Sequence, residues 1–512
     1  MLVKTYGSAV NGIHATTITI EVDVTAGIKF FLVGLPDNAV KESEQRIRAA
    51  LQNNGYRIPG KKIIINMAPA DIKKEGSSYD LPLAIGILAA SGQIKSNKIA
   101  DYIIMGELSL DGGLHHIKGA LPIAVKAREE GYKGIILPKE NAREAAIVND
   151  LDVLGVDNIK QLIDFFNGEI EIEKTELDTR AEFYAALNNN LPDFSDVKGQ
   201  ENIKRALEIA ASGGHNVIMI GPPGAGKTML AKRMSGILPP LSLQEALETT
   251  KIHSVAGKMT ANDTLITSRP FRSPHHTISD VALVGGGGNP QPGEISLAHN
   301  GVLFLDELPE FKRSVLEVMR QPLEDRVVTI SRAKSTVDYP ASFMLISSMN
   351  PCPCGYYNHP EKDCMCPPGM VQKYLNKISG PLLDRIDLHI EVTPVSFTEL
   401  SSKEKGESSN DIRKRVIESR DIQEKRYIED EMVHSNAQMS SKQLQKFCNL
   451  DKESREMLKM AMEKLNLSAR AYDRILKVSR TIADLSNSEN IESQHIAEAI
   501  QYRSLDREGW AG

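Results

Sequence analysis

The fold of the chain is decided by the stretch Val217-Ile218-Met219-Ile220-Gly221-Pro222-Pro223-Gly224-Ala225-Gly226-Lys227-Thr228. Four apolar residues lead into a complete G-x-x-x-x-G-K-[ST] pattern, and residues 229–234 have the composition of a helix. In this strand–loop–helix context the glycines let backbone N–H groups surround phosphates, Lys227 reaches the β- and γ-phosphates, and Thr228 binds Mg²⁺. We therefore expect residues 221–228 to bind ATP with Mg²⁺ in an α/β domain whose parallel sheet is covered on both faces.

The second half of such a site is expected where the apolar run Val302–Leu305 is followed by Asp306 and Glu307. Two adjacent carboxylates beside a buried strand are costly unless a cation compensates them. Nucleotide hydrolysis needs one carboxylate near the metal and one group that orients water. We therefore expect Asp306 to lie near Mg²⁺ and Glu307 to polarise the attacking water.

The order of these motifs resembles that of AAA+ ATPases. The phosphate loop and the carboxylate pair are followed by a strand at residues 343–347 that leads to Asn350, and then by Leu-Leu-Asp-Arg at 382–385. The resemblance implies that Asn350 hydrogen-bonds the attacking water or the γ-phosphate and that Arg385 acts on the nucleotide of a neighbouring subunit. It also implies that Arg470, at the start of a lid helix, contacts the nucleotide. An arginine that acts between subunits implies a homo-oligomeric ring, most often a hexamer.

An insertion lies between the phosphate loop and the carboxylate pair, at residues 269–276 and 285–288. It resembles the helix-2 insert of magnesium-chelatase motor subunits and minichromosome-maintenance helicases. It contains the adjacent histidines His275 and His276. Because adjacent histidines in a loop more often make structural hydrogen bonds than bind a metal, we expect no metal site here.

Residues 326–339 form two β-rich arms around a basic turn, which predicts a hairpin. In the resembled helicases the equivalent hairpin contacts the phosphate backbone, so the resemblance implies DNA binding by Arg332 and Lys334. An exposed basic turn without a partner is the alternative.

Four of the five cysteines form the pattern C-x-C-x₉-C-x-C, at Cys352, Cys354, Cys364 and Cys366. In a reducing compartment such clustering favours a metal over disulfides. Four thiolates at this spacing can reach one tetrahedral Zn²⁺, with His359 as an alternative ligand to one of them. Free or redox-active thiols are the other interpretation.

Residues 1–170 alternate short β-rich runs with helical stretches, which predicts a separate α/β domain. Residues 106–113, 123–128 and 135–138 resemble the proteolytic domain of Lon-type proteases, which has a ribosomal S5-type α/β fold. Ser78 matches the position of the nucleophile, but the position of the lysine base falls on Leu121. A leucine cannot take a proton, so we expect this domain to be proteolytically inactive and to serve assembly or binding.

The pattern along the chain predicts five segments. They are a Lon-protease-like domain at 1–170, a linker at 171–192, an AAA+ core at 193–395, a charged helical connector at 396–439 and an all-α lid at 440–512. This order resembles the ComM/YifB family of magnesium-chelatase-like ATPases. The resemblance implies an ATP-hydrolysing ring motor that acts on DNA, as a helicase or branch-migration factor in recombination or natural transformation. A chelatase-type motor that drives metal insertion into a porphyrin and a protein-remodelling ATPase are the alternatives.

The composition limits where and how such a protein works. The 61 basic and 67 acidic residues of the 512-residue chain give a formal net charge of −6, so any contact with single-stranded or branched DNA has to come from a local patch. No apolar run reaches the roughly 18 residues of a membrane span, and the first residues do not resemble a signal peptide. We therefore expect a cytoplasmic protein without a membrane partner.

Overall fold

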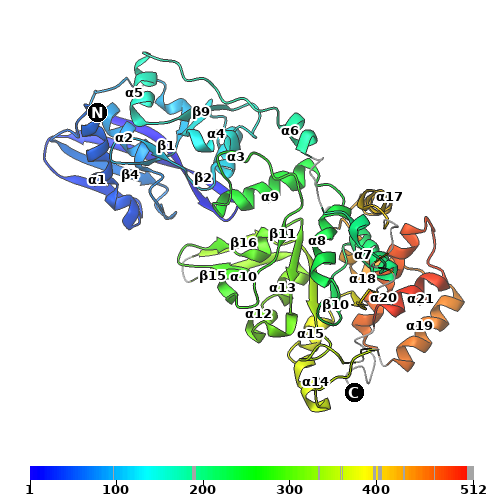
Figure 1. Cartoon of the computed structure of the whole chain (residues 1–512). Helices are drawn as coiled ribbons and strands as arrows, with labels where there is room; N and C mark the ends of the chain where they lie inside the picture. Colours follow the sequence, from blue (N-terminus) through cyan, green and yellow to red (C-terminus); the bar gives the residue numbers. More distant parts are fainter. Residues whose placement is uncertain are drawn as a thin grey trace.

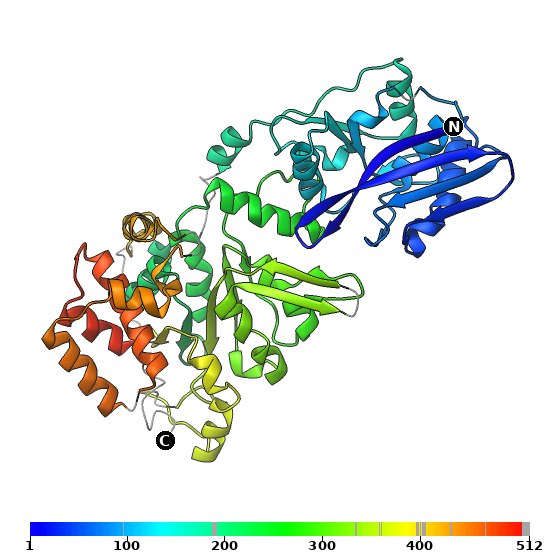
Figure 2. The same cartoon turned by 180° about the vertical axis from the view of Figure 1, so that it is seen from behind.

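The computed structural model describes residues 1–95, 97–186, 192–332, 335–357, 359, 361–395, 399, 401, 406–430, 433–465 and 467–503. An N-terminal α/β domain, a second α/β domain and a helical lid follow one another along the chain (Figures 1 and 2). Within the described residues, no helix has the length and apolar character needed to cross a membrane.

The N-terminal domain is built on a mixed sheet, which has seven strands among the described residues in the order β3-β4-β2-β1-β5-β8-β9. The long arms β1 and β2 pair antiparallel from Leu2↔Asp23 to Asn11↔His14. Its strands are β1 (Leu2–Asn11), β2 (His14–Thr25), β3 (Phe30–Val33), β4 (Lys62–Ala68), β5 (Tyr102–Ile104), β8 (Gly134–Pro138) and β9 (Asp152–Val156), with β6 (Glu107–Leu108) and β7 (Leu114–His115) in a small separate ladder. Its helices are α1 (Asn38–Asn53), α2 (Asp80–Ala90), α3 (Ala120–Glu129), α4 (Lys139–Ala145) and α5 (Ile159–Asn167).

The second domain is built on a parallel sheet in the order β11-β14-β17-β10-β18. Every residue of β10, β14 and β17 is buried, as the short apolar runs predict for strands covered on both faces. The strands are β10 (Val217–Ile220), β11 (Phe271–Arg272), β14 (Val302–Leu305), β17 (Met344–Met349) and β18 (Leu388–Glu391). The helices are α7 (Glu201–Gly213), α8 (Lys227–Ile237), α9 (Leu243–Val255), α10 (Asp280–Val284), α11 (Glu294–Leu297), α12 (Arg313–Glu317), α13 (Arg320–Asp325), α14 (Pro368–Leu375) and α15 (Gly380–Leu383).

The predicted hairpin is present as β15 (Val327–Arg332) paired antiparallel with β16 (Ser335–Pro340). It projects from the second domain on the side that faces the N-terminal domain (Figures 1 and 2). The turn between β1 and β2 touches it, since a Cβ atom built on Gly12 would lie 2.9 Å from Cγ1 of Val337. A short ladder of β12 (Gly285–Gly286) and β13 (Gln291–Pro292) lies in the inserted segment.

The charged stretch predicted as a connector contains α17 (Ser409–Arg426), which packs against α7 and α8 and against the lid. Ile412 and Val416 are buried in the core of the second domain. The sequence predicted a charged helical connector, and the structure shows that one face of this helix is buried. The lid consists of α18 (Ser441–Phe447), α19 (Lys452–Lys464), α20 (Ala469–Leu485) and α21 (Ser493–Gln501).

The segment predicted as a linker is partly built into the N-terminal domain. The N–H of Thr175 donates to the carbonyl oxygen of Val153 at 2.9 Å, and Ile172 lies in the domain core. The segment also contains helix α6 (Thr179–Ala186), whose Phe183 packs against Leu241 of the second domain. The described part of this segment therefore contacts both α/β domains.

Helix α9 of the second domain packs against α3 of the N-terminal domain. The Ser254 hydroxyl of α9 donates to the Glu144 carboxylate of α4, and the N–H of Gly119 donates to the carbonyl oxygen of Ser254 at 3.2 Å. Glu144 is 2% exposed, and its carboxylate also accepts the N–H of Leu121 at 3.0 Å. Burial raises the pKa of Glu144, although the Ser254 hydrogen bond acts in the opposite direction.

Candidate nucleotide site and cysteine cluster

The site lies at the carboxyl ends of three neighbouring strands, β14, β17 and β10. The phosphate loop follows β10, the carboxylate pair follows β14, and Asn350 follows β17. Gly224 and Gly226 have φ angles of +79° and +87°, in the left-handed region that favours glycine. Helix α8 begins directly after them at Lys227, so its N-terminus faces the loop.

Lys227 connects the phosphate loop to Asn350. Its ammonium donates to the carbonyl oxygens of Gly221 at 2.7 Å and Pro222 at 3.0 Å, and to Oδ1 of Asn350 at 3.2 Å. The side chain is largely buried, and this burial lowers the pKa of Lys227, while the charges of Asp306 and Glu307 act in the opposite direction. The lysine is thus held at the loop by three oxygen atoms.

Thr228 and Asp306 lie together as candidate magnesium ligands. The Thr228 hydroxyl donates to Oδ2 of Asp306 at 2.7 Å, and the Ser348 hydroxyl donates to Oδ1 of the same carboxylate. Hydroxyl and carboxylate oxygens are the donors that Mg²⁺ prefers, so this pair fits the ion. Ser348 was not identified from the sequence, although two consecutive serines in an otherwise apolar strand were a usable signal.

Glu307 is more than half exposed and has a left-handed backbone, with φ of +54°. Nδ1 of His276 lies 3.6 Å from Oε2 of Glu307, and the rings of His275 and His276 are 4.1 Å apart between centroids. Nδ1 of His275 is paired with the Thr277 hydroxyl at 2.9 Å. The histidine pair therefore lies beside the carboxylate expected to orient water, a placement that the sequence did not indicate.

A second residue missed in the sequence is Gln200. Its Nε2 donates to the carbonyl oxygens of Ala225 at 3.1 Å and Thr393 at 3.0 Å. The side chain thereby joins the phosphate loop to the segment that follows β18. Nothing in its sequence context distinguishes it from any other polar residue before a helix.

The two arginines expected around the nucleotide are both paired with acidic residues within the chain. Arg385 is 6% exposed; its guanidinium pairs with Glu324 at 2.5 Å and donates to the carbonyl oxygen of Pro381 at 2.6 Å. Arg470, at the start of α20, pairs with Asp384 at 3.2 Å. The lid helix is therefore joined to the residue next to Arg385.

Of the two residues expected to bind DNA, Arg332 is exposed at the end of β15, and Lys334 lies outside the described residues.

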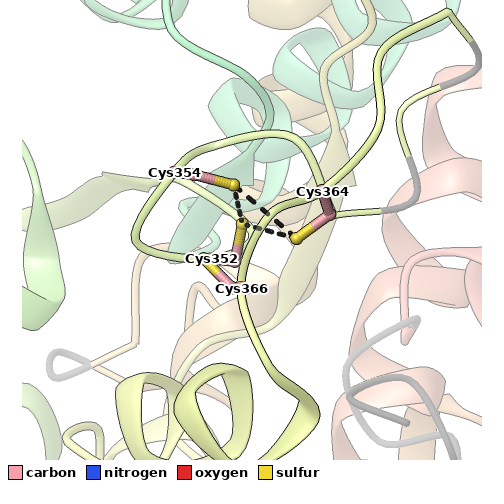
Figure 3. Close-up of side chains that lie close together, drawn as sticks. All are labelled: Cys352, Cys354, Cys364 and Cys366. Atoms are coloured by element: carbon pink, nitrogen blue, oxygen red, sulfur yellow. Dashed lines mark hydrogen bonds between the residues drawn. The ribbon is translucent and has the colours of Figure 1, made fainter.

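The four clustered cysteines come together after β17, with their sulfur atoms within 4.8 Å of one another (Figure 3). The sulfur of Cys352 is 3.3 Å from that of Cys354 and 3.6 Å from that of Cys364. A tetrahedral ion with Zn–S bonds of about 2.3 Å needs sulfur atoms roughly 3.8 Å apart, so the donor set fits Zn²⁺.

The pKa of the Cys354 thiol is lowered to about 6; burial opposes this shift, but hydrogen bonds from the N–H of Tyr356 and from Cys352 outweigh it. Nδ1 of His359 instead accepts the N–H groups of Glu361 at 3.0 Å and Lys362 at 3.1 Å. The structure therefore groups the four thiols and gives His359 a role in a turn.

In the N-terminal domain, Ser78 is half-buried and its carbonyl oxygen accepts the N–H of Gly106 at 2.8 Å. Leu121 is fully buried in the domain core, at the start of α3. The position to which the resemblance assigns the protease lysine thus carries a buried apolar side chain next to the contact with α9.

Three family models match consecutive parts of the chain. They are described as subunit ChlI of Mg-chelatase over residues 20–141, magnesium chelatase subunit ChlI over 193–400, and its C-terminal region over 406–503. The protein YifB of Escherichia coli is 45% identical over 504 residues, covering 97% of this chain and 96% of the relative. The competence protein ComM of Haemophilus influenzae is 44% identical over 507 residues, covering 98% and 97%.

A shorter part of the chain is similar to Lon proteases. Lon protease 2 of Bacillus subtilis is 34% identical over 154 residues, which are 27% of this chain and 26% of that protease. This similarity confirms the expected Lon-like fold of the first domain, and the match over residues 193–400 confirms the magnesium-chelatase type of AAA+ domain for the second. The chain belongs to the ComM/YifB family of magnesium-chelatase-like AAA+ ATPases.

Proposed function

We propose that the protein is an ATP-hydrolysing ring motor that moves along or remodels DNA. The observation that carries the hydrolytic part is the convergence of Lys227, Thr228, Asp306, Glu307 and Asn350 at the ends of three adjacent parallel strands. Positioning and charge stabilisation are the main contributions that a protein makes to phosphoryl transfer, and this set supplies both.

Each residue has a distinct task in this proposal. The N–H groups of the loop and the Lys227 ammonium bind the β- and γ-phosphates, and Thr228 and Asp306 hold Mg²⁺. A Mg²⁺ ion held by these two side chains would supply positive charge to offset the negative charge that develops on the phosphates during hydrolysis. Glu307 accepts a proton from the attacking water, and Asn350, which already contacts Lys227, orients that water or the γ-phosphate.

Assembly into a ring, as a hexamer, places Arg385 at the nucleotide of the next subunit. Because Arg385 is paired with Glu324 within its own chain, this step requires the pair to open. Arg470 contacts the nucleotide from the lid, and its pairing with Asp384 joins the lid to the segment that carries Arg385.

The DNA part of the proposal is supported by the hairpin β15–β16 and by the relative named as a competence protein. Arg332 is exposed near the tip, and Lys334 follows it in the sequence. Repeated around a ring, these cations neutralise backbone phosphates locally, in spite of the net charge of −6.

The test is the rate of ATP hydrolysis with and without single-stranded or forked DNA. We expect DNA to stimulate hydrolysis in the wild type, and the double variant Arg332→Ala, Lys334→Ala to lose the stimulation while it keeps the basal rate. Lys442→Ala, an exposed lysine of the lid, is the matched control and should respond as the wild type does. Stimulation should fall with rising salt, because phosphate contacts release counterions.

Indifference of the wild type to every DNA would contradict the DNA proposal. It would favour a chelatase-type motor, which the magnesium-chelatase family models support, or a protein-remodelling ATPase. An absence of ATP hydrolysis would contradict the motor itself.

A further inference from the structure

The segment that carries the four cysteines lies directly against the phosphate loop. Going along the chain from β17, the carbonyl oxygen of Met349 accepts the N–H of Gly221 at 3.2 Å, and Asn350 accepts a hydrogen bond from Lys227 at 3.2 Å. The next contact comes from the cysteine segment: a Cβ atom built on Gly355 would lie only 2.4 Å from Cδ and 2.9 Å from Cγ of Pro223.

This last contact requires a glycine. Gly355 follows Cys354 directly and has a φ of +85°, a left-handed conformation that other residues adopt only with strain. Its backbone therefore approaches the ring of Pro223 more closely than any side chain would permit. Pro223 lies in the middle of the phosphate loop, so its position helps to fix the direction of the neighbouring loop N–H groups.

Gly355 lies in a segment that has no regular secondary structure among its described residues. Between the end of β17 at Met349 and the start of α14 at Pro368, the described residues form turns and bends but no helix or strand. The hydrogen bonds within the segment are local, such as that from the N–H of Gly355 to the carbonyl oxygen of Cys352 at 3.0 Å. The four sulfur atoms, in contrast, connect its two ends (Figure 3).

We propose that the four cysteine thiolates bind one Zn²⁺-type cation and that this ion holds Gly355 against Pro223, so that metal loading sets the affinity of the phosphate loop for nucleotide. Metal binding then joins Cys352 and Cys354 to Cys364 and Cys366 as one unit, since filling a metal site orders the residues that form it. Loss of the metal frees this unit, so that Gly355 is no longer held against Pro223 of the phosphate loop. The inference rests on the proposed function in so far as residues 221–228 are the ATP site.

The direct test compares the purified full-length protein before and after metal removal with a thiol-reactive mercurial, followed by dithiothreitol and a chelator. Metal content is measured by inductively coupled plasma mass spectrometry, and nucleotide affinity by fluorescence of a labelled ATP analogue. We expect one zinc per chain, a Kd that rises about 10-fold or more on stripping, and recovery of the original Kd on addition of Zn²⁺. The same treatment of Cys448→Ser, which removes the cysteine outside the cluster, should give the same result.

The contact itself is tested by Gly355→Ala, which keeps all four thiols but places a Cβ atom against Pro223. We expect this variant to retain zinc and to bind the ATP analogue more weakly. Gly131→Ala is the matched control, because Gly131 has a φ of +77° and no atom within 4 Å of its built Cβ, so it carries the backbone strain without the contact. It should bind zinc and nucleotide as the wild type does.

Protein that retains no zinc, or whose Kd is the same with and without zinc, would overturn the inference. An unchanged Kd in a zinc-loaded Gly355→Ala variant would do so as well. These results are independent of hydrolysis: zinc-loaded protein that binds ATP without hydrolysing it contradicts the proposed function and leaves the inference intact. A hydrolysing protein whose Kd ignores zinc contradicts only the inference.

Discussion

The two α/β domains of this chain differ in the side chains at the positions where catalytic groups are expected. In the second domain, Thr228, Asp306 and Ser348 come from three different elements and meet in one hydrogen-bonded group. In the first domain, Leu121, at the position that the resemblance to Lon-type proteases assigns to the lysine base, is fully buried. The buried carboxylate next to it, Glu144, accepts hydrogen bonds from Leu121 and from Ser254 of the other domain.

This difference indicates what each domain contributes. The candidate nucleotide site places the half-buried Asp306 and the exposed Glu307 near the buried cation of Lys227, an arrangement suited to binding and hydrolysing a charged ligand. The N-terminal domain has the apolar Leu121 at the position expected for a lysine base, and a polar contact to helix α9. We infer that the first domain serves as a support that packs against the second domain, and three experiments test the contrast.

The largest expected effect is on hydrolysis. Glu307→Gln should still bind ATP, but its turnover should fall by about 10²–10⁴-fold, because the amide cannot accept the proton of the attacking water. The measurement is phosphate release at saturating ATP together with nucleotide binding.

Ser78→Ala is the counterpart in the first domain and should leave both quantities unchanged. Hydrolysis at the wild-type rate in Glu307→Gln, or loss of a measurable peptidase activity in Ser78→Ala, would remove the contrast between the two domains.

The next effect concerns the buried leucine. Leu121→Lys places an ammonium in the core of the first domain and should destabilise that domain by about 3–5 kcal/mol, since the charge has no water around it. Hydrogen–deuterium exchange of peptides from residues 1–170 in urea measures this loss.

Leu121→Met, which conserves the volume of the side chain, should lower the stability of the first domain by less than about 1.5 kcal/mol. A Leu121→Lys variant that is as protected as the wild type and cleaves a peptide substrate would show instead that the first domain is a latent protease.

The smallest effect is at the contact between the domains. Burial raises the pKa of Glu144, so the folded state favours its protonated form. The stability that this group contributes is complete below its ordinary pKa of 4.5 and is lost as the pH rises through the higher value of the folded state. Ser254 opposes the shift, so Ser254→Ala should raise the pKa further and destabilise the protein by about 1–3 kcal/mol at neutral pH.

Urea unfolding from about pH 5 to pH 8 measures the free energy of unfolding of the wild type and of Ser254→Ala. The difference between the two free energies should grow with pH. Glu140→Gln, an exposed change on the same helix α4, should behave as the wild type does. If the difference in free energy of unfolding between the two proteins is constant over this range, or shrinks with rising pH, Glu144 is not the group in contact with Ser254.

Much of the second domain could be predicted from local pattern. The apolar runs at 217–220 and 302–305 have the bounds of β10 and β14. The β-rich arms predicted within residues 326–339 form the hairpin. The charged segment around α17 was less predictable, because an amphipathic helix with few apolar residues has nearly the same composition as a solvated one. The structure of the segment after residue 170 was equally difficult to predict. Its polar sequence gives no sign of the backbone hydrogen bond from Thr175 to Val153.

The sequence by itself determined the phosphate loop, the carboxylate pair and the cysteine spacing, because each is a short pattern whose chemistry depends on neighbours in the chain. Only the tertiary structure brought Ser348 to Asp306, His276 to Glu307, and Gly355 to Pro223. The order of strands in the sheet sets these contacts, and that order depends on packing across the whole domain. The burial of Arg385 against Glu324 and the contact of Ser254 with Glu144 have the same origin: each joins residues that only the folded chain makes neighbours.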